Sequence, residues 1–315
     1  MLPELFLERL KRIVSEKKYT LVLETFHQGK QLSVRVNTLK ISSDDARNYF
    51  TAKNISAEEA LLRNQSFIIK GIAPQEFSRL DFVCDGKMYM QSLSSMLPVI
   101  VLDPQPGDNV LDLCAAPGSK TTQMAAQMRN QGNIVAIDSV RPRFYRLKSV
   151  LTLLGVGIAQ AKCLDGSRYR SGEMLFDRIL VDAPCSSESR FKSFDKKTVG
   201  YWSLRKVKEM VRKQRGLLLN ACRLLKPGGI LVYSTCTFAP EENEGVVNWV
   251  LGKLPGEIQT EPIHLDLVER YPAILEWEKR KYDDQVVNCF RVLPTRLMEG
   301  FFMAKIVRAG YGSSS

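Results

Sequence analysis

Short amphipathic segments make up the first ninety residues of the chain. At its start, hydrophobic positions recur at helical spacing and form one stripe: Leu2, Phe6, Leu10 and Ile13. Alternating apolar positions then predict a strand within residues 31–40 and a second strand at 66–71. A Ser/Asp cap predicts a helix over residues 42–54, between these strands. We therefore predict a small α+β lobe over residues 1–91.

From about residue 92 the pattern changes to apolar strands that alternate with amphipathic helices. Five apolar runs predict strands: 109–114, 133–138, 157–163, 177–183 and 230–236. The helices predicted among them are 119–130, 141–154, 203–225 and 240–254. Two further strands, 288–294 and 300–308, are expected to close one edge. Such a pattern is typical of an α/β domain, here residues 92–310, with a mostly parallel seven-stranded sheet and an antiparallel edge. Residues 311–315 read as a flexible tail.

Polar and reactive residues follow the carboxyl ends of the predicted strands, where α/β sheets bind ligands. The first strand leads into CAAPGSK (114–120), whose small residues and helix N-terminus suit an anionic ligand group. The acids and cysteines after the later strands are Asp138, Asp165, Asp182, Cys185 and Cys236. A single acid at such a position can simply cap the next helix. Acids after three successive strands favour a binding site.

Asp138 indicates the kind of cofactor. An acid that ends the second strand of such a sheet commonly accepts hydrogen bonds from both ribose hydroxyls. The G-x-G-x-x-G spacing of dinucleotide enzymes is absent. The pattern therefore favours an adenosine cofactor with a carboxylate end.

The charge balance points to a polyanionic partner. With 45 Lys and Arg against 34 Asp and Glu, the formal net charge is +11, and nucleic acid is the commonest partner of so basic a chain. Basic residues of the first lobe, such as Arg35 and Lys40, and of residues 189–197 are expected to contact phosphates. Phe191 and Phe194 would be available to stack on bases. RLKSVLTLL and VRKQRGLLL, by contrast, favour amphipathic helices over RNA contacts.

Cysteine usage bears on metal binding and location. There are seven cysteines, no C-x-x-C pair and two histidines, so we expect no metal site. We expect a reducing cytoplasm, which disfavours a Cys185–Cys236 disulfide without excluding it. No apolar run approaches the ~20 residues of a membrane span. The remaining cysteines outside the cofactor turn are expected to be buried core residues: Cys84, Cys163, Cys222 and Cys289.

Six motifs in a fixed order carry a family resemblance over about residues 1–308. They are RVNTLK, SSMLP, DLCAAPGSKTTQMAA, DAPCSSE, LKPGG and YSTCT-x-x-PEENE. The chain resembles the Sun/NOL1/NOP2 family of RNA cytosine-5 methyltransferases, and most of all its bacterial RsmF-like branch, which modifies 16S ribosomal RNA. The resemblance implies a class I, Rossmann-like methyltransferase fold, S-adenosylmethionine as cofactor, RNA as partner, an RNA-binding amino-terminal lobe and, we expect, a monomer.

The resemblance also implies roles for individual residues. Asp138 would bind the cofactor ribose with Arg143 as its basic companion, and Asp165 would lie near the adenine amino group. Asp182 and Lys120 would contact the target cytosine, with Asp182 also bordering the cofactor. The cofactor loop would be Cys114, Ala115, Ala116, Pro117, Gly118, Ser119 and Lys120.

The two cysteines would divide the chemistry. Cys236 matches the nucleophile that attacks carbon 6 of cytosine, and Cys185 the second cysteine, which assists product release. The turn CSSESRFKS departs from the commoner Cys-Ser-Gly pattern of the family. The additional carboxyl-terminal RNA-binding domain of the ribosomal enzymes has no counterpart in the sequence. Ribosomal RNA is the first expectation, with tRNA as an alternative substrate and a non-catalytic RNA-binding assembly factor as an alternative function.

Overall fold

The computed structural model describes residues 2–60 and 65–310; the predicted tail lies outside them. The chain divides into two compact units. One is Gln31–Gly166, and the other joins the residues up to Lys30 with those from Ser167 onward. The first two helices, α1 (Glu4–Ile13) and α2 (Glu16–His27), therefore cluster with the carboxyl-terminal half. The domain boundary at residue 91 stays a prediction.

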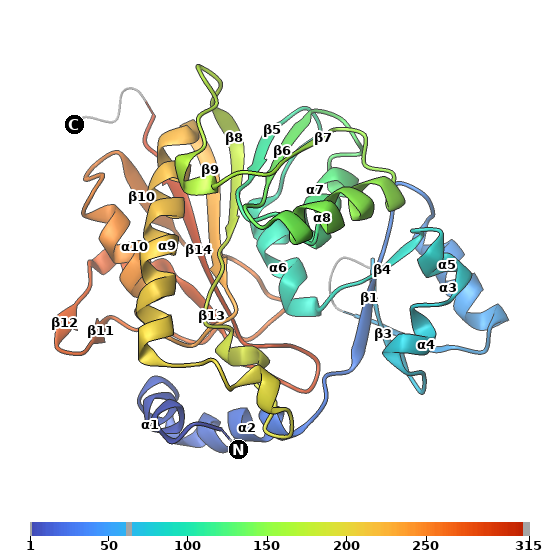
Figure 1. Ribbon diagram of the computed structural model, residues 1–315, viewed down its shortest axis with the longest axis horizontal. Helices are drawn as coiled ribbons and strands as arrows, with labels where there is room; N and C mark the ends of the chain where they lie inside the picture. Colours follow the sequence, from blue (N-terminus) through green and yellow to red (C-terminus); the bar gives the residue numbers. More distant parts are fainter. Residues whose placement is uncertain (1, 61–64, 311–315) are drawn as a thin grey trace. The chain divides into compact units, whose positions relative to one another are not determined.

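The unit Gln31–Gly166 begins with a small antiparallel sheet (Figure 1). Its strands lie in the order β2-β3-β1-β4. They are β1 (Leu32–Val36), β2 (Ser56–Glu59), β3 (Ser66–Lys70) and β4 (Met88–Met90). The helices of this part are α3 (Ser43–Ala52), α4 (Pro74–Phe77) and α5 (Asp81–Cys84). The predicted cap is confirmed, because the Ser42 hydroxyl accepts from the Asp45 N–H and the Asp45 carboxylate from the Ser42 N–H.

Three parallel strands and three helices complete this unit. The strands pair in the order β5-β6-β7, all parallel. They are β5 (Asn109–Asp112), β6 (Asn133–Ile137) and β7 (Ala159–Lys162). The helices are α6 (Leu93–Leu102), α7 (Ser119–Gln127) and α8 (Arg141–Leu153). Gly155, at φ +72°, lies just past the end of α8, as the sequence predicts.

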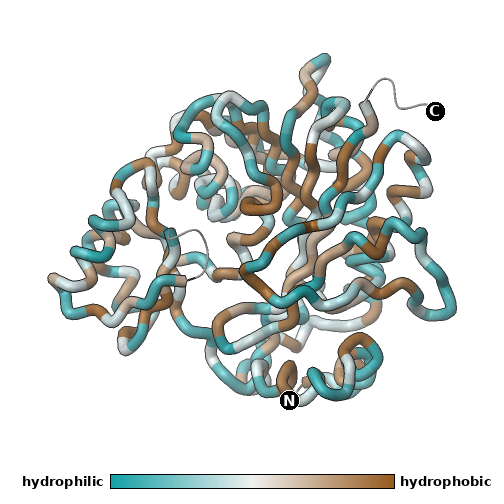
Figure 2. Tube along the Cα trace, turned by 180° about the vertical axis from the view of Figure 1, so that it is seen from behind, coloured by the Kyte–Doolittle hydropathy of each residue, from teal (hydrophilic) through white to brown (hydrophobic). Residues whose placement is uncertain are grey.

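The other unit carries strands in the order β10-β14-β9-β8. β8 and β9 are parallel, whereas β14 runs antiparallel to β9, β10 and β13. The strands are β8 (Phe176–Asp182), β9 (Leu225–Thr235), β10 (Ile258–Glu261), β13 (Phe290–Val292) and β14 (Phe301–Arg308), with a hairpin of β11 (Glu276–Trp277) and β12 (Arg280–Lys281). The long helices are α9 (Leu204–Leu224) and α10 (Glu244–Leu251). Figure 2 shows apolar residues along the strands, as the buried pattern requires.

The alternation of strands and helices, the parallel pairs and the antiparallel edge confirm the predicted α/β class, with local differences. α6 and the β11–β12 hairpin were not predicted. β9 begins at Leu225, because Leu225 already pairs with Phe176 across a bulge in β8. β14 is not an edge strand, since the unpredicted β10 covers it. α10 begins four residues late, at Glu244.

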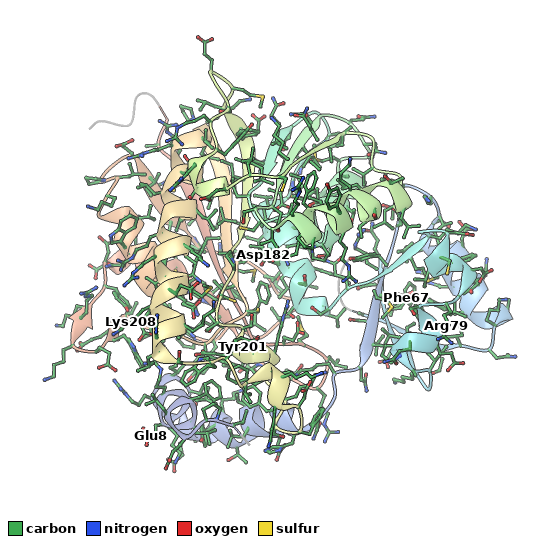
Figure 3. All side chains as sticks on the ribbon, in the orientation of Figure 1. Glu8, Phe67, Arg79, Asp182, Tyr201 and Lys208 are labelled. Atoms are coloured by element: carbon green, nitrogen blue, oxygen red, sulfur yellow. The ribbon has the colours of Figure 1, made fainter. Side chains whose placement is uncertain are left out.

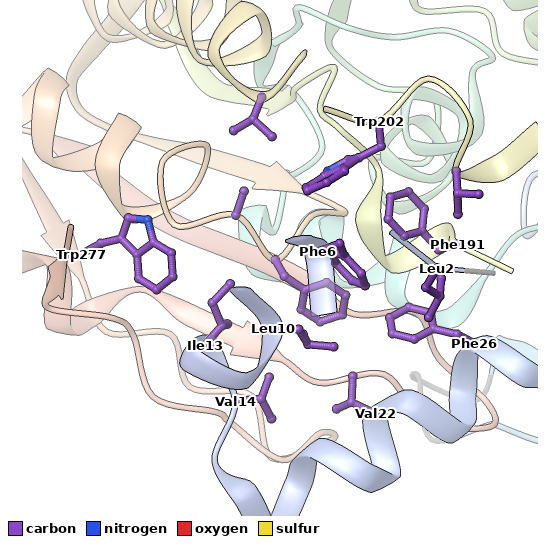
Figure 4. Packing of buried hydrophobic residues seen from close by; sticks show 14 residues of the cluster. Leu2, Phe6, Leu10, Ile13, Val14, Val22, Phe26, Phe191, Trp202 and Trp277 are labelled. Carbon is purple, nitrogen blue, oxygen red and sulfur yellow. The ribbon is translucent and has the colours of Figure 1, made fainter. Parts of the chain in front are cut away.

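An aromatic cluster packs α1 and α2 onto the carboxyl-terminal half (Figure 4). The predicted stripe of α1 is buried, and Phe6 contacts Phe191, Trp202 and Phe238 at ring-centroid distances of 5.0, 5.8 and 6.4 Å. Phe191 is 2% exposed, so the prediction that it stacks on RNA bases is wrong. Phe194, at 64%, is exposed as expected.

The prediction of buried cysteines is confirmed only in part, and the prediction that Arg35 contacts phosphates is wrong. Cys222 and Cys289 are buried as predicted, but Cys84 and Cys163 are exposed. Arg35 is buried and donates to Gln91 and Thr122, while Lys40 donates to the carbonyls of Asp85 and Leu153. The buried Arg35 therefore stabilises the fold and does not offer its charge to phosphates. Lys40 is exposed and bonds to neutral carbonyls, so its phosphate contact stays a prediction. Of the helices within residues 2–60 and 65–310, none combines the length and apolar character that crossing a bilayer requires.

Candidate active site

The loop Cys114–Lys120 joins β5 to α7 and is shaped by Gly118. Gly118 has φ +110° and is the residue before the first turn of α7. A Cβ there would lie 3.1 Å from Val150 and 3.2 Å from Leu147, both on α8. Only glycine suits this conformation and this close packing. Gly118, the N-cap residue of α7, has no side chain to cap the helix, so its first N–H groups present a positive helix end.

Asp138 and Arg143 brace this loop from the end of β6. The Asp138 carboxylate, 4% exposed, accepts from the N–H of Ala116 at 3.3 Å and of Val140 at 3.0 Å. Arg143 lies 3.3 Å from the same carboxylate and donates to the Ala116 carbonyl at 2.6 Å. The structure thus brings together the loop, the acid and the basic companion that the sequence singled out.

Three further predicted residues of this unit have different surroundings. Lys120 is buried on α7, and its Nζ donates to Ser95 Oγ at 2.8 Å. Cys114 is half-buried, and its N–H donates to Asp112. Asp165 is exposed, directly before a short 3-10 helix, Gly166–Arg168.

The two cysteines meet where β8 and β9 end in the other unit. Asp182 and Ser234 are partners in the parallel register, and Ser234 Oγ donates to Asp182 Oδ1 at 2.9 Å. The turns that follow bring Cys185 and Cys236 together, with their Sγ atoms 3.4 Å apart. Both cysteines are free, so the alternative of a disulfide is not realised. Cys236 is 8% exposed.

The environment favours a thiolate on Cys236. The pKa of Cys236 is lowered to about 6, and the largest cause is a hydrogen bond from the Cys185 thiol. Arg190 and Ser187 lower this pKa further, whereas burial and the charge of Asp182 raise it. The same bond holds the pKa of Cys185 well above its ordinary value. Arg190 is an exposed residue, and its own pKa is raised mainly by the negative charge of Cys236. A thiolate beside a neutral thiol and a guanidinium is poised for nucleophilic attack.

Two buried carboxyl groups hold the cysteine turns in place, and the sequence analysis missed both. Glu188 accepts from Thr237 Oγ1 at 2.8 Å, from the Phe238 N–H at 3.0 Å and from Trp202 Nε1 at 2.8 Å. It thereby ties the turn after Cys185 to the turn after Cys236. Ser189, next in the chain, donates its hydroxyl to the Cys236 carbonyl at 2.7 Å.

Glu242 forms the second tie. Its carboxyl accepts from the Ser186 N–H at 3.0 Å and from Gln214 at 2.7 Å. Burial and the nearby Glu188 raise the pKa of Glu242 to about 8. The only sequence feature that could have indicated Glu242 is the group of acids in PEENE (240–244). This group resembles the start of a helix, but Glu242 and Glu244 are buried.

Ion pairs connect the segment Glu241–Glu244 to α1 and to β13. Arg9 of α1 lies 2.7 Å from Glu241. Arg291 of β13 makes two bonds of 2.6 Å to the buried Glu244. Because fork-like charged pairs are geometrically specific, they fix the segment that supports Cys236.

The parallel strands, the connecting helices and the sites at strand ends define a Rossmann-like methyltransferase fold. Solved structures support this class. A methyltransferase homologue from Pyrococcus horikoshii matches with a TM-score of 0.79 and 31% identity over 98% of this chain and 100% of its own. NSun6 from Pyrococcus horikoshii with SFG matches with a TM-score of 0.82 and 22% identity, covering 98% of each chain, which shows the fold alone.

Sequence comparison gives the family. The model of the 16S rRNA methyltransferases RsmB/F matches residues 99–307, and the chain belongs to this family. The family resemblance inferred from the motifs is therefore confirmed. The tRNA (cytosine(49)-C(5))-methyltransferase of Pyrococcus abyssi is 41% identical over 87% of both chains. The ribosomal RNA small subunit methyltransferase F of Vibrio campbellii is 35% identical over 97% of this chain and 63% of its own, and human NSUN6, a tRNA (cytosine(72)-C(5))-methyltransferase, is 40% identical over 56% and 39%.

Proposed function

We propose that the protein is an S-adenosylmethionine-dependent methyltransferase that modifies carbon 5 of cytosine in RNA, with Cys236 as nucleophile. The single observation that carries this proposal is the Cys185–Cys236 pair, 3.4 Å between sulfurs, with Cys236 favoured as the thiolate. The family and the cytosine-5 relatives support the same reaction.

The residues of the first unit fit the cofactor. SFG, bound in the NSun6 structure, is an analogue of S-adenosylmethionine, and the latter supplies an electrophilic methyl group when bound. The open helix end and Gly118 would accept the cofactor's carboxylate end. Asp138, held by Ala116, Val140 and Arg143, would orient the ribose. Asp165 would face the adenine amino group.

Cys236 would begin the reaction by adding to carbon 6 of cytosine. This bond breaks the aromaticity of the ring and makes carbon 5 nucleophilic, so that it can accept a methyl group. Asp182 and Lys120 would contact the cytosine and stabilise the charge that moves into its ring. After methylation carbon 5 loses its proton, the Cys236–carbon 6 bond breaks and the thiolate leaves. Cys185, a neutral thiol in hydrogen-bond contact with Cys236, would assist this release.

Among RNA substrates, we now place tRNA before ribosomal RNA. The tRNA enzyme of Pyrococcus abyssi matches over 87% of its own length, whereas the Vibrio methyltransferase F is covered over 63%. Ribosomal RNA, the first expectation from the motifs, stays the alternative.

Bisulfite sequencing of transcripts treated with the purified protein tests the proposal. Unmodified tRNA and 16S ribosomal RNA are incubated with S-adenosylmethionine, and Cys236→Ser serves as the control. We expect 5-methylcytosine at one position of a tRNA with the parent protein and none with Cys236→Ser. Methylation of ribosomal RNA alone would reverse the substrate assignment. No methylation of either RNA would contradict the enzymatic proposal and leave an RNA-binding function.

A further inference from the structure

A basic groove follows one face of α9, and neither Cys185 nor Cys236 is among the residues that line it. It consists of two hollows of about 470 and 280 Å³, and Lys208 and Arg212 line both. Arg205 adds a cation to the larger hollow, and Arg215 and Arg280 add theirs to the smaller one. Figure 3 labels Lys208 on α9, the long helix that Figure 1 shows beside the β11–β12 hairpin.

The cations of the groove share one helix face. Arg205, Lys208, Arg212 and Arg215 are spaced by three, four and three residues, which brings successive side chains onto one stripe. At 1.5 Å per residue the stripe is about 15 Å long, and a nucleic-acid strand carries several phosphates over that length. The amphipathic pattern predicted for this helix is confirmed by its buried apolar residues, and the groove is part of its polar side. The expectation that VRKQRGLLL makes no RNA contact is not tested, and the proposal below reverses it.

The acids of the groove do not neutralise these cations. Glu209 binds Lys206 and Lys213 at 3.3 and 2.8 Å, and Glu241 binds Arg9 at 2.7 Å. Within residues 2–60 and 65–310, the side chains of Lys208 and Arg212 form no hydrogen bond or ion pair. The groove therefore has an excess of positive charge that the fold itself leaves uncompensated.

Arg215 is a cation of the groove whose hydrogen-bonding capacity and charge the described residues do not fully satisfy. Its guanidinium lies 5.2 Å from the Trp249 ring, and its buried Nε has no hydrogen-bond partner among the described residues. Burial and the like charge of Arg280 lower the pKa of Arg215. Two arginines that repel each other around an open hollow would both be stabilised by an anion placed between them.

We propose that this groove, α9 from Arg205 to Arg215 completed by Arg280, binds backbone phosphates of the RNA substrate. The proposal rests on the proposed function and extends it to a surface outside the reacting residues. The groove borders the catalytic segment, since Glu241 lines it and the next residue, Glu242, holds the turn of Cys185. Phosphates bound in the groove would therefore contact a segment that is continuous with the residues supporting Cys236.

Paired substitutions in the same unit test the groove. Lys208→Gln/Arg212→Gln removes two cations of the groove. Lys226→Gln/Lys305→Gln removes two cations that lie outside it and pair with Asp177 and Glu261. Affinity for an unmodified tRNA transcript is measured by fluorescence anisotropy between 50 and 200 mM salt. We expect the first pair to reduce the slope of log affinity against log salt by about 1.4 to 2, with the control pair unchanged. Arg280→Gln should reduce it by about half as much.

The outcomes separate this proposal from the proposed function. Equal slopes for parent and groove variants, in a protein that still methylates RNA, would overturn the groove alone. Equal losses in both pairs would also overturn it, since only net charge would then matter. Failure of the parent protein to bind either the tRNA transcript or a 16S ribosomal RNA transcript would overturn both proposals. Melting temperatures close to the parent value confirm that each variant is folded.

Discussion

Replacing Arg190 by glutamine should raise the pKa of Cys236. The hydrogen bond from Cys185 is the largest cause of the low pKa, and the charge of Arg190 is the next that lowers it. A neighbouring opposite charge shifts a pKa by about 1 to 3 units, and the low end of this range applies because Arg190 is a smaller cause than the Cys185 hydrogen bond. We therefore expect an increase of about one unit, equivalent to about 1.4 kcal/mol between the protonation states.

The change should be largest near pH 6. With a pKa of about 6, half of Cys236 is thiolate at that pH. One unit higher, the fraction at pH 6 falls to about a tenth, so alkylation by iodoacetamide should slow about fivefold. At pH 8 both forms are mostly thiolate and the rates should agree. The rate is followed by mass spectrometry of the Cys236 peptide, with the exposed Cys84 and Cys163 replaced by serine in every protein.

Two controls make the result specific to Arg190. Lys192→Gln removes an exposed cation of the same loop and should leave the midpoint of alkylation unchanged. Arg190→Lys keeps the positive charge and should therefore keep most of the lowering of the Cys236 pKa. An unshifted midpoint in Arg190→Gln, or an equal shift in Lys192→Gln, would refute the assignment of Arg190.

Three further predictions concern the cofactor and the fold. S-adenosylmethionine at 100 times its dissociation constant should stabilise the protein by about 2.7 kcal/mol, and Asp138→Ala should lose most of the resulting melting-temperature shift; a full shift would exclude the ribose contact. Because the pKa of Glu242 is raised to about 8 on folding, folded protein holds a proton that unfolded protein releases above about pH 4.5. The parent should therefore lose stability from pH 5 to 8 relative to Glu242→Gln in thermal unfolding, and parallel curves would contradict this. Phe6→Ala should lower the free energy of unfolding by about 3–5 kcal/mol in urea, since Phe6 is 2% exposed; a loss below 1 kcal/mol would show that the cluster around α1 is loosely packed.

Residues at strand ends could be predicted because the architecture itself brings them together. Apolar runs locate the strands, and parallel pairing then places Asp182 beside Ser234 and brings Cys185 to Cys236. The same logic located Asp138 beside the loop of Ala116. These predictions needed only the period of the strands and the direction of pairing.

Loop residues could not be predicted in this way. Phe191 and Phe194 lie three residues apart in one loop, and packing against Phe6 and Trp202 buries the first of them. Glu188 and Glu242 resemble surface acids in sequence, yet their carboxyl groups are buried where two turns need hydrogen-bond acceptors. Burial that depends on contacts distant in sequence leaves no periodic signal.

Trapping of the covalent protein–RNA adduct tests the central claim most directly. Cys185→Ala, Cys236→Ala and the double variant are incubated with RNA, with and without S-adenosylmethionine, and resolved on a denaturing gel. The reactions are run at pH 8, because loss of the Cys185 hydrogen bond should raise the pKa of Cys236. Cys185→Ala should accumulate a slowly migrating adduct that depends on S-adenosylmethionine, since attack proceeds but release is impaired. Cys236→Ala and the double variant should form none, whereas an adduct in Cys236→Ala would contradict the account by making Cys185 the nucleophile.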